Sequence, residues 1–221
     1  MALQPLAERM RPKTLDEYIG QQHLVGQGAV LRNMIETGRI HSIILWGPPG
    51  VGKTTLAKII AKSGNRAMYT LSAVSSGVKD VREVLDKAEH QRFFDTQSPI
   101  LFIDEIHRFN KSQQDSLLAA VEQGIITLIG ATTENPSFEV ISPLLSRCEV
   151  YVLKPLEKED LERLLDNTIH NDSELKKMNI KVEETTALFR QSGGDARKLL
   201  NILEIVIMPK LPTLWLSTMR W

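Results

Sequence analysis

Short apolar runs alternate with helical patterns along the first two thirds of the chain. Runs rich in β-branched and aromatic residues predict strands, and apolar positions recurring every three or four residues predict helices. Strands that alternate with helices favour a parallel sheet flanked by helices. The strands are expected at 42–46, 67–71, 99–103, 125–131 and 149–153, and the helices between them at 54–62, 78–92 and 112–123.

The pattern changes after Pro155, where the strand patterns end. Apolar residues from Leu161 to Ile169 fall at helical spacing, and two further helices are expected at about 183–191 and 196–206. We therefore predict an α/β domain over residues 1–154 and a small all-helical lid domain over 155–206. Residues 207–221 show little periodicity and predict an irregular tail.

The composition is that of a globular protein, with 42% hydrophobic and 24% charged residues among 221. Lys and Arg together number 27, as do Asp and Glu, so any contact with DNA requires a local basic patch. The single cysteine, Cys148, forms no internal disulfide. Because the N-terminus is charged and no run approaches the roughly 20 apolar residues of a membrane span, we expect a cytoplasmic protein without membrane contact.

The segment Gly47-Pro-Pro-Gly-Val-Gly-Lys-Thr54 fits the phosphate-loop pattern GxxxxGK[ST], between a predicted strand and a predicted helix. Glycines there let backbone amides turn toward phosphates, Lys53 would reach the β- and γ-phosphates, and Thr54 would coordinate Mg²⁺. The positive end of the following helix favours the same anion. The residues predicted to bind nucleotide here are Gly47, Pro48, Pro49, Gly50, Val51, Gly52, Lys53, Thr54 and Thr55.

Two carboxylates, Asp104 and Glu105, end the third predicted strand. Such a pair is commonly a solvated turn, but after a phosphate loop it indicates that Asp104 helps to hold Mg²⁺. Glu105 is then the general base for the attacking water. The following Asn110-Lys111-Ser112-Gln113 lacks the final Asp of a guanine-reading motif, and no strand separates it from the acidic pair, so adenine is favoured over guanine.

Three further residues are candidates for sensing or stabilising a bound triphosphate. Thr133 ends the fourth strand, which we expect beside the strand that carries Asp104. Arg147 precedes the last strand, near the edge of the sheet. Arg197 lies in the first turn of the last helix, with Asp195 as its N-cap. Taken alone, Thr133 would be read as a strand-end hydroxyl and Arg147 as a surface arginine, whereas Arg197 could bring a cation from the helical domain over the nucleotide.

Together these motifs resemble an AAA+ ATPase, and longer strings narrow the resemblance to the replication-associated recombination protein A family, which includes the Werner-helicase-interacting ATPases and is related to clamp loaders. The resemblance covers about Pro5 to Val206. It is carried by Pro5-Leu-Ala-Glu-Arg-Met-Arg-Pro12, Ile19-Gly-Gln-Gln-His-Leu24, Leu45-Trp-Gly-Pro-Pro49, Asp104-Glu-Ile-His-Arg-Phe-Asn-Lys-Ser-Gln-Gln-Asp115 and Ile129-Gly-Ala-Thr-Thr-Glu-Asn-Pro-Ser-Phe138.

The resemblance implies roles for the matching positions. Thr133 would be the first sensor, Arg197 the second, and Arg147 an arginine finger acting on the ATP of a neighbouring subunit. A finger supplied in this way is worth about 10³–10⁵ in rate in other phosphate-loop enzymes. The adenine pocket would be lined by Met10, Arg11, Pro12, Ile19 and Gly20.

A local basic stretch offers a site for DNA. Residues 53–92 hold eight Lys or Arg against four Asp or Glu. Ser75-Ser-Gly-Val-Lys-Asp-Val-Arg82 resembles the clamp-loader segment that follows DNA phosphates, so we predict that Lys79 and Arg82 contact the DNA backbone. The alternative, weighed equally, is a solvated helix face whose charges pair locally.

The sequence thus predicts an ATP- and Mg²⁺-dependent, DNA-dependent AAA+ ATPase that maintains, repairs or restarts replication forks in the bacterial cytosol or nucleoid. The alternatives are a clamp-loader subunit, a Holliday-junction branch-migration motor, and an ATP-binding scaffold without turnover. The resemblance implies single-stranded or forked DNA, repair proteins such as single-strand-binding protein and a homo-oligomer as partners. The family continues into a further helical region that drives assembly, so a truncated chain with weakened assembly is expected here.

Overall fold

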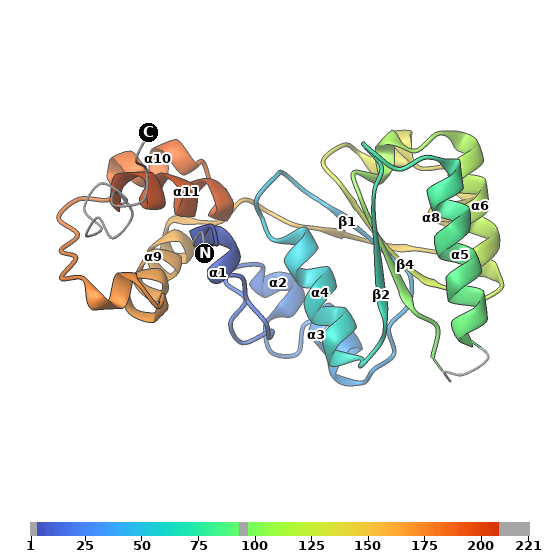
Figure 1. The fold of residues 1–221 in the computed structure, drawn as a ribbon, viewed down its shortest axis with the longest axis horizontal. Coiled ribbons are helices and arrows are strands. Elements are labelled where there is room, and N and C mark those ends of the chain that lie inside the picture. Colours follow the sequence, from blue (N-terminus) through green and yellow to red (C-terminus); the bar gives the residue numbers. More distant parts are fainter. Residues whose placement is uncertain (1–3, 93–96, 208–221) are drawn as a thin grey trace, which may run out of the picture. The chain divides into compact units, whose positions relative to one another are not determined.

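The structure is a computed structural model that describes residues 4–92 and 97–207 (Figure 1). The chain divides into an α/β unit, Pro12–Leu156, and a helical unit to which residues 4–11 and 157–207 belong. The division near residue 156 lies close to the predicted boundary at 154. The first residues group with the helices instead of the α/β domain to which the sequence assigned them. The tail expected at 207–221 lies outside the described residues, except Ile207.

The α/β unit is built on one five-stranded parallel sheet, as predicted. Its strands follow the spatial order β2-β3-β4-β1-β5, so β4 lies between β1 and β3. All four neighbouring pairs are parallel, and their carboxyl ends therefore meet at one edge of the sheet. The strands are β1 (Ile43–Trp46), β2 (Met68–Ser72), β3 (Ile100–Asp104), β4 (Thr127–Thr132) and β5 (Glu149–Val152).

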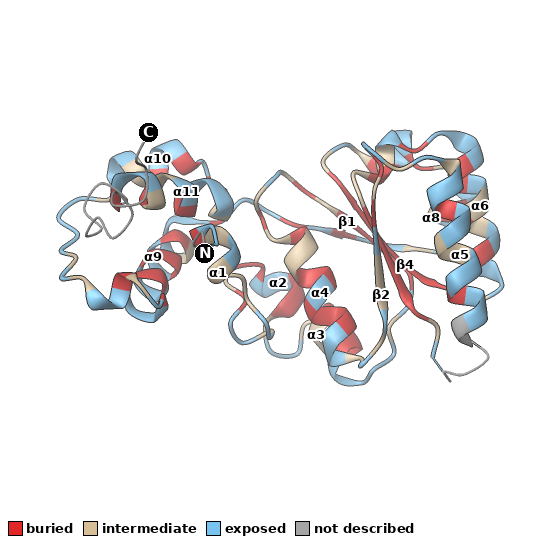
Figure 2. Cartoon of the chain, in the orientation of Figure 1, coloured by how far each residue is buried: buried red, intermediate tan, exposed pale blue. Residues whose placement is uncertain are grey.

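Helices cover both faces of this sheet (Figures 1 and 2). Successive strand residues point to opposite faces, so Ile43 and Leu45 join one core and Ile44 the other. The first core is closed by α2 (Gln22–Val25), α3 (Val30–Glu36) and α4 (Lys53–Ser63). The second is closed by α5 (Val78–Arg92), α6 (Lys111–Glu122) and α8 (Ser142–Leu145), with the short elements η1 (Ile106–Arg108) and α7 (Pro136–Glu139) beside the strand ends.

Local signals fix both ends of α6. The Asn110 side chain accepts from the Gln113 amide and the Gln113 side chain accepts from the Asn110 amide, each at 3.0 Å, which is a capping box. At the other end Gly124, with φ +66°, allows the Ile125 amide to reach the Ala120 carbonyl at 2.9 Å. The segment that was compared with a guanine-reading motif therefore begins a helix.

Within residues 4–11 and 157–207 the helical unit has five helical elements, and its core comes from their amphipathic faces. On the last helix the buried residues are Leu199, Leu200, Leu203 and Ile207, at helical spacing. The helix expected at 183–191 begins later, because the Glu184 carboxylate accepts from the Thr186 amide at 2.8 Å and starts the helix there. The elements are α1 (Leu6–Arg9), α9 (Lys158–Asn171), η2 (Leu175–Lys177), α10 (Thr186–Ser192) and α11 (Ala196–Ile207).

A buried ion pair fastens α1 to the other helices of this unit. Arg9 Nε and Nη2 donate to the two carboxylate oxygens of Asp172 at 2.7 and 3.1 Å, and the Asp172 side chain is 1% exposed. Asp172 also accepts from the Glu174 and Leu175 amides. Burial alone would raise the pKa of Asp172, but the Arg9 and amide hydrogen bonds outweigh it and hold that pKa below its usual value. Glu204 of α11 accepts from the Leu6 amide at 3.0 Å.

None of the helices within residues 4–92 and 97–207 has the length and apolar character needed to cross a membrane.

Candidate nucleotide-binding site

The phosphate loop joins the carboxyl end of β1 to the first turn of α4. Its glycines are required by contact: a Cβ on Gly47 would lie 2.4 Å from the Leu153 carbonyl oxygen, and one on Gly52 2.5 Å from the Tyr18 hydroxyl. Gly52 also has φ +97°, which disfavours any other residue. The loop backbone is therefore closely packed from behind, with the N-terminus of an 11-residue helix at its end.

Lys53 is held against its own loop. Its ammonium donates to the carbonyl oxygens of Gly47 at 2.6 Å and Pro48 at 2.8 Å, and the residue is 7% exposed. Thr54 and Thr55 follow in the first turn of α4 and are half-buried. The structure thus brings the loop glycines, Lys53 and the two threonines together as the sequence predicted.

Tyr18 supports the loop and was missed by the sequence analysis. Its hydroxyl donates to the Val51 carbonyl at 3.1 Å, and burial raises the pKa of the phenol well above its usual value, so it stays a neutral donor. Gln21 fastens the same segment by two hydrogen bonds to the Lys154 backbone, at 2.6 and 2.9 Å. Ile19 and Gly20, predicted to line the adenine pocket, lie between these two anchors.

The acidic pair and Thr133 meet at the same edge of the sheet. Asp104 is the last residue of β3, and Glu105 follows it with a left-handed backbone, φ 55°. Thr133 follows β4, which lies between β3 and the loop-bearing β1, and its hydroxyl donates to Glu105 Oε2 at 3.3 Å. The predicted adjacency of these two strands is confirmed.

Two further residues that the sequence analysis passed over complete this cluster. His107 Nδ1 lies 3.0 Å from Thr132 Oγ1 and 3.3 Å from Glu105 Oε2. Thr132 is fully buried at the end of β4. The only signal for His107 in the sequence was its place two residues after Glu105.

The residues at the carboxyl ends of the strands fit a nucleoside triphosphate with Mg²⁺. The loop ends at the N-terminus of α4, whose backbone amides favour an anion, and Lys53 adds a positive charge at the same place. Thr54 and Asp104 supply a hydroxyl and a carboxylate, the oxygen ligands that Mg²⁺ prefers. Among the described residues no group of three or more His, Cys, Asp or Glu could hold a metal ion.

Arg147 lies at the opposite edge of the sheet from the phosphate loop of its own chain. It precedes β5, whose first residue pairs with Ile43, the first residue of β1. Its guanidinium forms an ion pair with Glu122 and donates to the Pro143 carbonyl at 2.8 Å. Arg147 is therefore not part of the phosphate site of its own subunit.

The helical unit carries Arg197, predicted to be a sensor, and Met10 and Arg11, predicted to line the adenine pocket; these roles remain predictions. Arg197 is exposed in the first turn of α11, and Asp195 caps that turn by accepting from the Lys198 amide at 2.8 Å, as expected. Met10 and Arg11 belong to the helical unit, whereas Pro12 belongs to the α/β unit. The adenine wall that these residues were predicted to form stays a prediction.

The predicted DNA contacts lie on the exposed side of α5. Lys79 and Arg82 are both exposed, and no ion pair to either is found within the described parts of the chain. Lys87, on the same helix, does pair with Glu83 at 2.7 Å. The local pairing offered as the alternative therefore holds for Lys87, and DNA binding by Lys79 and Arg82 stays a prediction.

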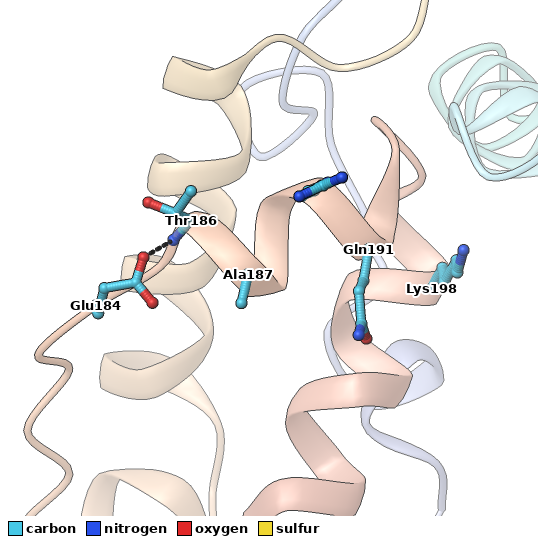
Figure 3. Close-up of a pocket in the computed structure, with 6 residues that line it drawn as sticks. Glu184, Thr186, Ala187, Gln191 and Lys198 are labelled. Carbon is cyan, nitrogen blue, oxygen red and sulfur yellow. Dashed lines mark hydrogen bonds between the residues drawn. The ribbon is translucent and has the colours of Figure 1, made fainter.

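A pocket on the helical unit is lined by none of the residues predicted to bind nucleotide (Figure 3). Gln191 and Lys198 line it from α10 and α11, and the Glu184 carboxylate beside it is hydrogen-bonded to the Thr186 amide.

A family model described as "ATPase family associated with various cellular activities (AAA)" matches residues 43–156, just over half of the chain. The chain belongs to the AAA family of ATPases. The matched AAA region runs from the start of β1 past β5, so it contains the phosphate loop, the acidic pair, Thr133 and Arg147.

Among proteins similar in sequence to this chain are several named for replication and recombination. The chain is 51% identical over 205 residues to replication-associated recombination protein A of Coxiella burnetii and 50% identical over 206 residues to that of Escherichia coli. These matches cover 91% and 92% of this chain but 46% of each relative, so the chain spans about half their length. ATPase WRNIP1 of Dictyostelium discoideum is 48% identical over 205 residues, covering 92% of this chain and 23% of its own.

Among solved structures, the RuvB Holliday junction branch migration motor of Thermotoga maritima has a similar fold. The TM-score is 0.71 at 29% sequence identity, covering 91% of this chain and 68% of RuvB. The expected resemblance to the replication-associated recombination protein A group of AAA proteins is confirmed, and so is the fold class.

Proposed function

We propose that the chain binds and hydrolyses ATP and works on DNA in the maintenance, repair or restart of replication forks. The observation that carries the ATPase is the cluster at one sheet edge. Buried Lys53 lies in its glycine loop, Asp104 ends β3 and Glu105 follows it. With Thr133 after the intervening β4, these are the parts that phosphoryl transfer to water requires.

In this proposal the loop amides and Lys53 hold the phosphates, and the ammonium exchanges its two carbonyl contacts for phosphate oxygens. Glu105 orients the attacking water and accepts its proton, while Thr133 fixes the carboxylate. Mg²⁺, held by Thr54 and Asp104, would neutralise charge on the phosphate oxygens.

The proposal includes a second copy of the chain, whose ATP would be contacted by Arg147. Because Arg147 stands at the sheet edge away from its own phosphate loop, it reaches an ATP only across an interface between two copies. A homo-oligomer in which Arg147 serves the neighbouring site is therefore part of the proposal, and an isolated subunit would hydrolyse slowly. Arg197 would act in cis from the helical unit.

The DNA role is supported by about 50% identity to replication-associated recombination protein A over more than nine tenths of this chain. Single-stranded or forked DNA is the proposed partner, together with proteins such as single-strand-binding protein. A branch-migration motor is the second candidate, favoured by the RuvB-like fold. The sequence identity between this chain and RuvB is lower, at 29%.

Phosphate release by the whole chain, measured with Mg²⁺-ATP alone, with single-stranded DNA, with forked DNA and with a Holliday junction, tests the proposal. We expect turnover that rises most with forked or single-stranded DNA. A rise with the Holliday junction alone would favour the motor. Binding of ATP without any phosphate release would show an ATP-binding scaffold and contradict the proposal.

A further inference from the structure

The hydrogen bonds around Thr132 decide where His107 carries its proton. Thr132 Oγ1 accepts from the Glu134 amide at 3.0 Å and donates its one proton to the Glu134 carbonyl at 3.2 Å. With the hydroxyl proton on that carbonyl, the 3.0 Å contact between Thr132 Oγ1 and His107 Nδ1 takes an N–H from the ring, and this is the tautomer we infer. The carboxylate oxygen 3.3 Å from the same nitrogen can only accept, which demands the same proton.

The proton on Nδ1 has a consequence for Glu105. One oxygen, Oε2, accepts from the Thr133 hydroxyl at 3.3 Å and lies within ion-pair distance of His107 Nδ1, also at 3.3 Å. Among the residues that the structure describes, no hydrogen bond or ion pair engages the other oxygen, Oε1. The contacts described for this carboxylate thus all fall on Oε2.

The ring itself is well fixed. The His107 side chain is 11% exposed in the short element η1, whereas that of Glu105 is 30% exposed. Thr132, its partner, is fully buried and tied to the turn at Glu134. A donor on such a support can orient a carboxylate at little further cost in side-chain entropy.

We propose that His107 is a positioning residue, whose Nδ1–H holds Glu105 Oε2 so that Oε1 faces the attacking water. This inference rests on the proposed ATPase function. It assigns His107 no proton transfer of its own, since its donor faces Glu105 and Thr132.

Steady-state turnover and ATP affinity of four variants of the whole chain test the inference. We expect His107→Ala to lower kcat about 10- to 100-fold, as small misplacements of catalytic groups do, with the Kd for ATP within twofold. His107→Asn should recover most of kcat because its amide places a donor near Nδ1, and His107→Gln, whose donor sits near Nε2, should not. His90→Ala, which changes an exposed histidine of α5, should match wild type.

Three results would overturn the inference: a kcat for His107→Ala within twofold of wild type, equal recovery by Gln and Asn, or equal losses in kcat and ATP affinity. The last would indicate a purely structural histidine.

Nitrogen-15 NMR of labelled histidine supplies a readout independent of turnover. At pH 8 the His107 resonances, assigned by their loss in His107→Asn, should show the proton on Nδ1 and should shift in Glu105→Gln. A proton on Nε2 would refute the inference. Failure of wild type to release phosphate would instead refute the proposed function, while the NMR result would still show whether His107 carries its proton on Nδ1 beside Glu105.

Discussion

The α/β unit and the helical unit each bury one charged residue among those that the structure describes, and they use it differently. Lys53 donates to carbonyl oxygens of its own loop, five and six residues away. Asp172 meets Arg9 from 163 residues away and accepts two backbone amides. Contacts within a loop can be exchanged for a ligand, whereas contacts between distant elements hold them together. Buried charge in this molecule therefore serves binding in one unit and stability in the other.

The largest effect is expected from Glu105→Gln in the α/β unit. Removing the proposed general base should lower kcat about 10²- to 10⁴-fold while ATP binding stays within a few fold, because Glu105 lies beside Thr133 and His107 rather than the phosphate loop. Single-turnover phosphate release and nucleotide titration measure the two. Near-normal turnover would show that another group is the base.

Arg9→Ala should act on stability instead. It leaves the buried Asp172 carboxylate without its ion pair, at a cost of about 3–5 kcal/mol, and should leave the ATP affinity of the remaining folded protein unchanged. Chemical denaturation measures the loss. Lys158→Ala is the control, since Lys158 and Glu162 are exposed on α9 at 3.6 Å and such a pair contributes less than about 1 kcal/mol. Equal effects of the two variants would contradict the distinction drawn here.

Acid should remove the contribution of the Arg9–Asp172 ion pair to the free energy of unfolding. Because the pKa of Asp172 is lowered in the folded protein, the stabilisation is complete above the unfolded value of about 3.9 and is lost as pH falls through the folded value. The difference in stability between wild type and Arg9→Ala should be constant from pH 7 to about pH 5 and shrink below pH 4. A constant difference down to pH 3 would exclude Asp172 as the titrating group.

The smallest effect concerns DNA. Lys79→Ala with Arg82→Ala should reduce the slope of log K against log salt by about 1.5, as the loss of two phosphate contacts predicts. Lys87→Ala, which removes a lysine already paired with Glu83, should leave the slope unchanged. Fluorescence anisotropy with forked DNA over a salt series measures both. Identical slopes for all three proteins would show that α5 is a solvated face.

Much of the fold and part of the site could be predicted from local patterns. Each strand was placed within two residues, because hydrophobic periodicity acts over a few residues. The phosphate loop and the acidic pair are also contiguous. Their partner Thr133 was found because parallel strands align their ends.

The residues that were missed depend on contacts between distant segments. Tyr18 meets Val51 across 33 residues, and His107 meets Thr132 across 25. The N-terminal helix α1 has four residues, too few to show a period, and its place in the helical unit is set by Arg9 and Asp172. No local pattern carries such pairings, since they exist only once the chain has folded.

Calorimetric titration of the 221-residue chain with Mg²⁺-ATP tests the central claim most directly, with Lys53→Ala as the matched variant. Because Lys53 is the buried cation of the phosphate loop, we expect saturable uptake of one ATP per chain by wild type and at least a tenfold weaker Kd in the variant, whose thermal unfolding should stay close to wild type. No uptake by wild type, or equal uptake by both, would contradict the account.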